Sequence, residues 1–240
     1  MESGKMIYVM SDIHGKYDKF IKMLELIEFS ESDELYILGD IFDRGENSIL
    51  IFDYVLTHKN IHLIRGNHEQ MFLDWYDGID GSLWTGCNGG YDTLNQIIDI
   101  QEKVQFNYIN ELYKRINKLP LYKILEVNGN KFILVHAGLK FDNKNTDCSV
   151  EDFMLSQDKE VLLWDRSNIY SNKQFQDYTT IQGHTTVQYI SKKLEKFNIK
   201  VPNDRIINRG GNIYIDCGAC FTDGKLACLR LDDMEEFYID

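Results

Sequence analysis

The sequence is poor in several features that mark particular classes of protein. Its 240 residues include two prolines and no repeat, low-complexity tract or Pro/Gly/Ser-rich linker, so nothing divides the chain and its length fits one domain. Basic residues are also scarce, with 26 Lys and Arg against 38 Asp and Glu. The net charge of −12 argues against broad binding to DNA or RNA, which needs a basic face, so we expect no nucleic-acid partner.

Long apolar runs and a paired set of cysteines are missing as well. The N-terminal apolar run spans only residues 6–10, too short for the core of a signal peptide, and no later run approaches the length of a membrane span. The five cysteines are odd in number and lack the spacing of a secreted disulfide framework. We therefore expect a cytoplasmic protein with no membrane partner. Cys217 and Cys220 have C-x-x-C spacing, but without a second pair we interpret them as buried strand cysteines.

The chain does contain a regular alternation of short apolar runs and longer segments of helical periodicity. The runs at 6–10, 34–38 and 61–64 predict strands. Residues 17–29 and 48–58 place their apolar side chains at helical spacing and predict helices. Strands separated by helices of this length predict a parallel sheet.

The rest of the chain has a different pattern. The stretch after the third strand is mostly helical and rich in Asn, Tyr and Gln, which predicts a helical insert at about 70–119. Residues 128–130, Asn-Gly-Asn, predict the turn of a hairpin, and residues 212–219 and 225–233 predict a second hairpin. Together the two halves predict an α/β fold with mixed sheets, not a doubly wound parallel sheet.

Charged and polar side chains follow the predicted strands at the point where each strand ends. The carboxyl ends of parallel strands share one edge of a sheet, which is where ligands bind in open α/β sheets. Charged groups at such a place cost desolvation free energy unless something compensates them. The side chains concerned are Asp12 and His14 after the first strand, Asp40, Asp43 and Arg44 after the second, Asn67, His68 and Glu69 after the third, His136 after the hairpin strand, and His184 after a short β-like segment.

Two metal ions would provide this compensation. A mixed set of carboxylate, imidazole and amide groups suits divalent transition metals. Asp40 lies centrally among the predicted loops and has two oxygens, so it could bridge two ions about 3.5–4 Å apart, as in two-metal hydrolytic sites. The sequence therefore predicts a metal site built around Asp40.

Short motifs around these residues carry a resemblance to a known family. They are D-x-H-G at 12–15, G-D-x-x-D-R-G at 39–45, G-N-H-E at 66–69, H-A-G at 136–138 and G-H-T at 183–185. With these motifs in order, the sequence closely resembles the calcineurin-like metallophosphoesterases, particularly the phosphoprotein phosphatase type found as small bacterial and bacteriophage lambda-type Ser/Thr protein phosphatases. The resemblance implies one metallophosphoesterase domain over 1–240, with two packed mixed β-sheets flanked by helices in a four-layer sandwich.

The resemblance also implies the metal ligands. Two divalent ions are expected, with manganese first and iron or zinc as alternatives. The implied ligands are Asp12, His14 and Asp40 for one ion, and Asp40, Asn67, His136 and His184 for the other.

The remaining motif residues are implied to act on the substrate. His68 would be the general acid, with Asp43 hydrogen-bonded behind it. Arg44 would bind the substrate phosphate, together with Arg166 in a Trp-x-Arg pattern and Asn88 in a W-x-x-N-G-G segment.

This set of residues suits the hydrolysis of a phosphomonoester by direct attack of a metal-bridging hydroxide. Arg44 and Arg166 would offer planar, permanently charged donors to the phosphate oxygens. His68 would protonate the leaving alkoxide, and we expect Asp43 to fix the tautomer of His68 and keep it cationic. The expected substrate is a phosphorylated protein or a small phosphoester, with phosphoserine and phosphothreonine first and phosphotyrosine as an alternative.

Other interpretations stay open on the sequence alone. A dinucleoside tetraphosphate hydrolase or a phosphodiesterase could share the scaffold, but symmetrical tetraphosphate hydrolases typically have Ala in the D-R-G motif and end the third motif in Asp, whereas this chain has Asp43 and Glu69. A non-catalytic phosphate-binding protein should have lost a ligand or the general acid, and none is lost here. Asp43 could be only a salt-bridge partner of Arg44, and Arg166 only a surface residue. We interpret Glu69 as a first-turn helix carboxylate and the three tryptophans as packing residues.

Overall fold

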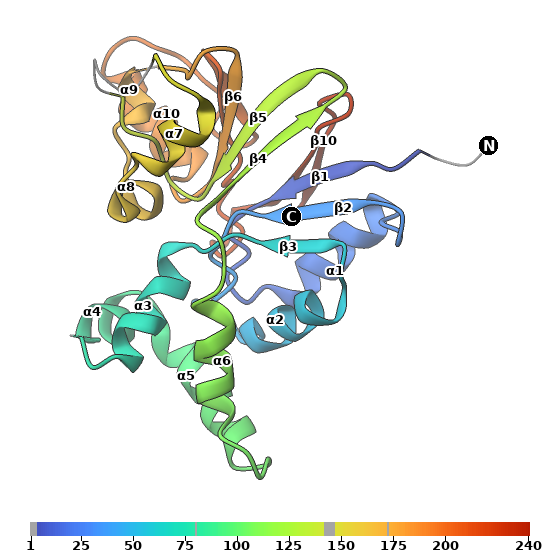
Figure 1. Ribbon diagram of the computed structural model, residues 1–240, viewed down its shortest axis with the longest axis vertical. Coiled ribbons are helices and arrows are strands. Elements are labelled where there is room, and N and C mark those ends of the chain that lie inside the picture. Colours follow the sequence, from blue (N-terminus) through green and yellow to red (C-terminus); the bar gives the residue numbers. More distant parts are fainter. Residues whose placement is uncertain (1–3, 80, 142–146, 172) are drawn as a thin grey trace.

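The computed structural model describes residues 4–79, 81–141, 147–171 and 173–240, which form two five-stranded β-sheets with helices outside them (Figure 1). The first sheet consists of β1 (Ile7–Met10), β2 (Glu34–Ile37), β3 (Ile61–Leu63), β9 (Leu226–Arg230) and β10 (Glu236–Ile239). The second sheet consists of β4 (Tyr122–Val127), β5 (Asn130–Val135), β6 (Tyr178–Gln182), β7 (Ile207–Arg209) and β8 (Asn212–Tyr214). Their strand orders are β10-β9-β1-β2-β3 and β4-β5-β6-β8-β7.

The helices fall into groups that flank the sheets (Figure 1). The first sheet is covered by α1 (Tyr17–Leu26) and α2 (Ser48–Thr57). On the side of the second sheet lie α7 (Val150–Leu155), α8 (Lys159–Trp164), α9 (Asn168–Ser171) and α10 (Val187–Glu195). The segment between β3 and β4 forms a separate group of α3 (Asn67–Tyr76), α4 (Ser82–Cys87), α5 (Gly90–Gln101) and α6 (Tyr108–Ile116).

The core is divided by the alternation of side chains along the strands. Val9 of β1 and Phe132 of β5 belong to one buried cluster between the two sheets. Tyr8 and Met10, the neighbours of Val9, pack instead in the cluster that contains residues of α1 and α2. Ile133, next to Phe132, packs in the cluster beneath α7. Because both faces of these strands are buried, their sequences are nearly continuous apolar runs, as the sequence showed.

Three neighbouring strands run parallel in each sheet, and this arrangement places the site. In the first sheet β1 pairs with β2 and β2 with β3; in the second sheet β5 pairs with β6 and β6 with β8. The carboxyl ends of each set of three share one edge, so the loops after them are neighbours.

The structure confirms the predicted mixed-sheet fold and corrects one element of it. The hairpin turn lies at Asn128 and Gly129, whose φ angles are 50° and 80°, and joins the antiparallel strands β4 and β5. The second predicted hairpin is wrong, because β8 pairs with β6 and β7 in the second sheet whereas β9 pairs with β1 and β10 in the first. Each of these apolar strands gains two neighbours in this way, which a hairpin at a sheet edge would not provide. None of the described helices has the length and apolarity needed to cross a bilayer.

Candidate active site

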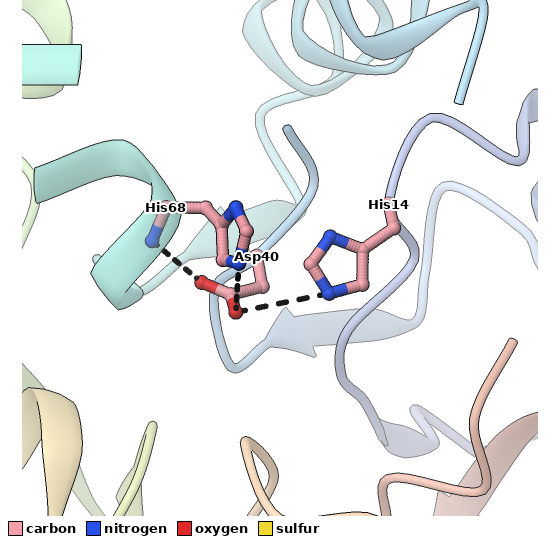
Figure 2. Close-up of side chains that lie close together, drawn as sticks. All are labelled: His14, Asp40 and His68. Carbon is pink, nitrogen blue, oxygen red and sulfur yellow. Dashed lines mark hydrogen bonds and ion pairs between the residues drawn. The ribbon is translucent and has the colours of Figure 1, made fainter. Parts of the chain in front are cut away.

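Asp40, in the loop after β2, lies at the centre of a group of buried side chains (Figure 2). Its Oδ1 accepts a hydrogen bond of 3.0 Å from the backbone N–H of His68. Its Oδ2 lies 3.8 Å from Nε2 of His14, 3.8 Å from Nε2 of His68 and 3.5 Å from Nε2 of His136. Imidazole nitrogens from the loops after β1 and β5 and from the first turn of α3 therefore surround one carboxylate oxygen.

The predicted ligands of the second metal are gathered together. Ligand atoms of Asp40, His136 and His184 all lie within 4.8 Å of one another. Oδ1 of Asn67 lies 2.8 Å from Nε2 of His136 and 2.9 Å from Nδ1 of His184. The loops after β2, β3, β5 and β6 thus bring four predicted ligands to one point.

The predicted first set differs in one member. His14 and Asp40 lie together, but His68 and not Asp12 completes that group of ligand atoms. Asp12 is buried and lines the same cavity, and its Oδ2 accepts hydrogen bonds from Ser11 Oγ and from the backbone N–H of His184. Oδ1 of Asp12 has no hydrogen-bond partner among the described residues, so it is the oxygen that would bind the metal ion if Asp12 is a ligand as predicted.

The hydrogen bonds of the histidines show whether a cation fits. Nδ1 of His136 lies 2.6 Å from the carbonyl oxygen of Leu38, and a carbonyl only accepts, so Nδ1 carries the proton and Nε2 presents a lone pair. That lone pair faces Oδ1 of Asn67 at 2.8 Å and Oδ2 of Asp40 at 3.5 Å, which are also acceptors. Acceptors gathered in this way repel one another unless a cation lies among them. The residues therefore fit a divalent metal ion with nitrogen and oxygen ligands.

Left-handed backbone conformations are concentrated in the loops that form the site. A positive φ is uncommon for residues other than glycine, and such conformations cluster at functional sites. Close packing of the loops also requires glycine at Gly66, where an added Cβ would lie 2.2 Å from Oδ1 of Asp40. The site residues with positive φ are Asp12, His14, Asp40, Asp43, Arg44 and His184.

Glu69 holds two of these loops against each other. Its side chain is fully buried, and its Oε2 accepts hydrogen bonds from the backbone N–H groups of Asp40 (2.9 Å) and Gly66 (2.8 Å). Its Oε1 accepts from the backbone N–H of Ile41 (2.9 Å). Glu69 is therefore more than a first-turn helix carboxylate, because it fixes the loop after β2 to the start of α3.

Asp43 is held by the helical segment between β3 and β4. Its Oδ2 lies 2.6 Å from Nδ1 of His68 and accepts a hydrogen bond of 2.7 Å from Nε1 of Trp84. Its Oδ1 accepts a hydrogen bond of 2.6 Å from Oγ1 of Thr93. Within the described part of the chain Asp43 forms no ion pair with Arg44, so the alternative of a plain salt-bridge partner does not hold. Trp84 packs as expected, but it also orients this carboxylate.

Burial shifts the pKa of both members of this pair. Burial raises the pKa of Asp43 to about 7, against the lowering effect of its hydrogen bonds from Thr93 and Trp84. Burial, followed by the positive charge of Arg44, lowers the pKa of His68 well below its ordinary value. Nη2 of Arg44 donates to Nε2 of His68 at 3.0 Å, so the ring proton is on Nδ1, facing Asp43. Asp43 therefore faces the ring nitrogen that carries the proton, which is the geometry of a residue that fixes the tautomer.

The residues predicted to bind phosphate line one cavity of about 220 Å³, together with the metal-ligand candidates Asp12, His14, Asp40, Asn67 and His184. Arg44 also donates through Nη1 to Nε2 of His14 at 3.2 Å, and Arg166 donates through Nε to Nε2 of His184 at 3.2 Å. Arg166 is therefore part of the cavity wall, although its side chain is exposed. Asn88, at the end of α4, lines the same cavity. The aromatic side chains in the lining are Trp164, Tyr189 and Phe221.

Comparison with known proteins agrees with this geometry. The sequence profile of the family described as calcineurin-like phosphoesterase matches residues 5–215. The chain belongs to this family. The sequence resemblance is thereby confirmed, and the protein is a phosphoesterase of a family that uses divalent metals.

The relatives of this phosphoesterase differ in their named substrates. It is 28% identical to serine/threonine-protein phosphatase 2 of Salmonella typhimurium over 234 residues, covering 94% of this chain and 92% of the relative. It is 25% identical to the symmetrical bis(5'-nucleosyl)-tetraphosphatase of Klebsiella pneumoniae over 210 residues, covering 83% of this chain and 67% of the relative. A solved serine/threonine phosphatase from Saccharomyces cerevisiae has the same fold, with a TM-score of 0.64 and 16% identity over 99% of this chain and 80% of that one.

The sequence prediction missed several residues of the phosphoesterase site. Trp84 and Thr93 come from the helical segment, and no spacing relates them to Asp43. Ser11, which donates to Oδ2 of Asp12, lies just before the first motif and outside it. Asp216 lines the cavity and directly follows the apolar run that contains β8. A charged residue at the end of an apolar run is the signal that selected the other site residues, and it would have selected Asp216 as well.

Proposed function

We propose that this phosphoesterase is a metal-dependent phosphomonoesterase that hydrolyses phosphoserine and phosphothreonine in proteins, with phosphotyrosine as a further substrate. The observation that carries the proposal is the buried Asp43–His68 pair, 2.6 Å apart, in which His68 lines the cavity and Asp43 lies behind it. A strongly basic alkoxide leaving group requires a proton, and His68 held by Asp43 would supply it once its Nε2 is protonated.

The metal ligands would hold two divalent ions, of which manganese is the first candidate. Bound there, the ions would activate water and neutralise the charge of the substrate phosphate. Asp40 would be shared by both ions. Asp12 and His14 would complete one set, and the other would consist of Asn67, His136 and His184, as the resemblance implies.

The side chains of the cavity would perform the remaining steps. Arg44 and Arg166 would turn from the imidazoles to the phosphate oxygens, because a guanidinium binds a dianionic phosphate more strongly than a neutral ring nitrogen. Nε2 of His68, no longer paired with Arg44, would take up a proton in the negative field of the phosphate and deliver it to the leaving oxygen. Nδ1–H remains on Asp43, so the ring does not rotate during the transfer.

A dinucleoside tetraphosphate hydrolase is the second candidate, favoured by the Klebsiella pneumoniae relative. Asp43 argues against it, because the symmetrical enzymes typically have Ala at this position. A phosphodiesterase on the same scaffold is a weaker candidate, since a diester with a good leaving group would not need the buried pair.

The test is phosphate release by the manganese-reconstituted protein from a phosphoserine or phosphothreonine peptide and from diadenosine tetraphosphate at equal concentration. We expect faster turnover of the peptide. Preference for the dinucleotide would keep the site and change the substrate class.

A further inference from the structure

The end of β8 carries an acidic residue for which the proposed function has no role. In the first sheet the three parallel strands β1, β2 and β3 each deliver candidate ligands from the loop that follows. In the second sheet β5 is followed by His136 and β6 by His184. The third parallel strand, β8, is followed by Asp216. Asp216 therefore occupies the one strand end of this set to which no function has been given.

The side chain of Asp216 points into the active-site cavity. Only 5% of the residue is exposed, and it lines the cavity together with Asp12 and Asp40. Its Oδ1 accepts a hydrogen bond of 2.8 Å from the backbone N–H of Gly218. Its Oδ2 has no hydrogen-bond partner in the part of the chain that the structure describes.

Asp12 and Asp40 are arranged in the same way. One oxygen of Asp12 accepts hydrogen bonds from Ser11 and His184, and one oxygen of Asp40 accepts from the backbone of His68. The other oxygen of each has no hydrogen-bond donor among the described residues. All three residues line the cavity, so these oxygens are open to a ligand there, and a cation or an ordered water would satisfy them. Asp216 thus repeats the pattern of the two predicted metal ligands.

The charges around Asp216 agree with this pattern. After burial, the largest cause that raises its pKa is the negative charge of Asp12, whereas Arg44 and Arg166 lower it. Two buried carboxylates therefore face one space that also holds the predicted phosphate-binding arginines. A divalent ion in that space would remove the repulsion between them.

We infer that Asp216 is a positioning residue of the metal centre, whose carboxylate strengthens the binding of the divalent ion on the Asp12 side of the cavity. It would act through its charge, because it lies beside Asp12 in the cavity lining but stands outside the motifs that carry the implied ligands. The inference rests on the metal dependence of the proposed function and adds a member from the second sheet. Residues that act on a metal in this way typically change its affinity about 10–100-fold when they are substituted.

A purely structural role is the competing explanation, since the bond from Gly218 closes a turn. Asp216→Asn separates the two, because the amide oxygen can still accept from Gly218 while the charge is lost. Asp216→Ser is a second neutral variant whose hydroxyl can accept the same bond. Asp223→Asn is the matched control, because Asp223 is exposed in the same loop between β8 and β9 and lies outside the cavity lining.

The experiment is a titration of the chelator-stripped full chain with Mn²⁺, followed through the electron paramagnetic resonance signal of the free ion, with folding checked by circular dichroism. We expect one of two manganese sites to weaken about 10–100-fold in Asp216→Asn and Asp216→Ser, and neither in Asp223→Asn. If folded Asp216→Asn binds manganese like the unsubstituted protein, the inference is wrong and the turn explains the residue. Should Asp216→Asn not fold, Asp216→Ser decides in the same way.

This readout does not depend on substrate. If the site weakens as expected but no phosphoprotein is hydrolysed, the inference stands and the proposed function fails. If the unsubstituted protein binds no manganese, zinc or iron, both fail.

Discussion

Replacing Trp84 by Phe tests whether Asp43 sets the activity of His68. The change removes the 2.7 Å hydrogen bond from Nε1 of Trp84 to Oδ2 of Asp43 and keeps an aromatic ring packed against Phe72 and Trp75. A hydrogen bond to a buried charged group contributes about 1.5–3 kcal/mol, and about 1.4 kcal/mol corresponds to one pKa unit. Loss of this donor disfavours the ionised carboxylate, so the pKa of Asp43 should rise from about 7 to about 8–9.

The consequence for activity follows from the sign of this shift. The ionised form of Asp43 is needed to stabilise His68 once its ring is protonated, so activity is present above the pKa of Asp43 and is lost as the pH falls through it. At pH 7 the ionised fraction should fall from about one half to about 1–10%, and kcat toward a phosphoserine peptide should fall roughly 5–50-fold.

The assay is the pH dependence of kcat between pH 5.5 and 9.5 in the presence of manganese. The acid limb should move up by about 1–2 units in Trp84→Phe, and activity should recover near pH 9, which a misfolded enzyme would not do. Trp75→Phe is the control, because Trp75 packs against the same ring but makes no hydrogen bond to Asp43. An unshifted acid limb in Trp84→Phe, or an equal shift in Trp75→Phe, would refute the reasoning.

Three further predictions concern the catalytic, structural and phosphate-binding residues. His68→Asn should lower kcat about 10²–10⁴-fold toward phosphoserine peptides, with manganese affinity retained. The loss should be much smaller toward p-nitrophenyl phosphate, because its leaving group needs no proton. Equal losses of kcat on both substrates would contradict the role of His68 as general acid. Glu69→Gln leaves two backbone N–H groups without an acceptor, so the free energy of unfolding should fall by about 2–4 kcal/mol, as measured by urea titration. An unchanged free energy of unfolding would show that the hydrogen bonds of Glu69 do not stabilise the loops. Arg166→Lys should raise KM about tenfold and change the free energy of unfolding less, since lysine cannot bind two phosphate oxygens in one plane. An unchanged KM would show that Arg166 is a surface residue that does not bind phosphate.

Much of the fold and the site could be predicted because both depend on local pattern. The strands β1, β2 and β3 are apolar runs that end where charge begins, and parallel strands bring such ends together. The ligand candidates are therefore fixed by spacing within short motifs. The pairing of β8 and β9 could not be predicted, because both are short, mostly apolar strands on either side of a turn, and their partners β6 and β1 lie far away in the sequence.

The hydrogen bonds around the carboxylates were also beyond the sequence, for a physical reason. Glu69 reaches the backbone of Asp40, 29 residues away, and Asp43 is held by Trp84 and Thr93, 41 and 50 residues away. Such contacts depend on how loops and helices pack in three dimensions. A motif gives the position of a charge but not the number of donors around it.

That number separates the buried acids of this site into two kinds. Glu69 and Asp43 have hydrogen-bond donors on both carboxylate oxygens, so they are held in place and can hold their neighbours. Asp12, Asp40 and Asp216 each have donors on one oxygen and leave the other toward the cavity. An oxygen in that position is open to the cavity, and a ligand of opposite charge bound there would be stabilised by it. The incomplete hydrogen bonding of these three carboxylates is thus what a cation site requires, and it is the reason for proposing that Asp216 supports the two acids that the motifs identified.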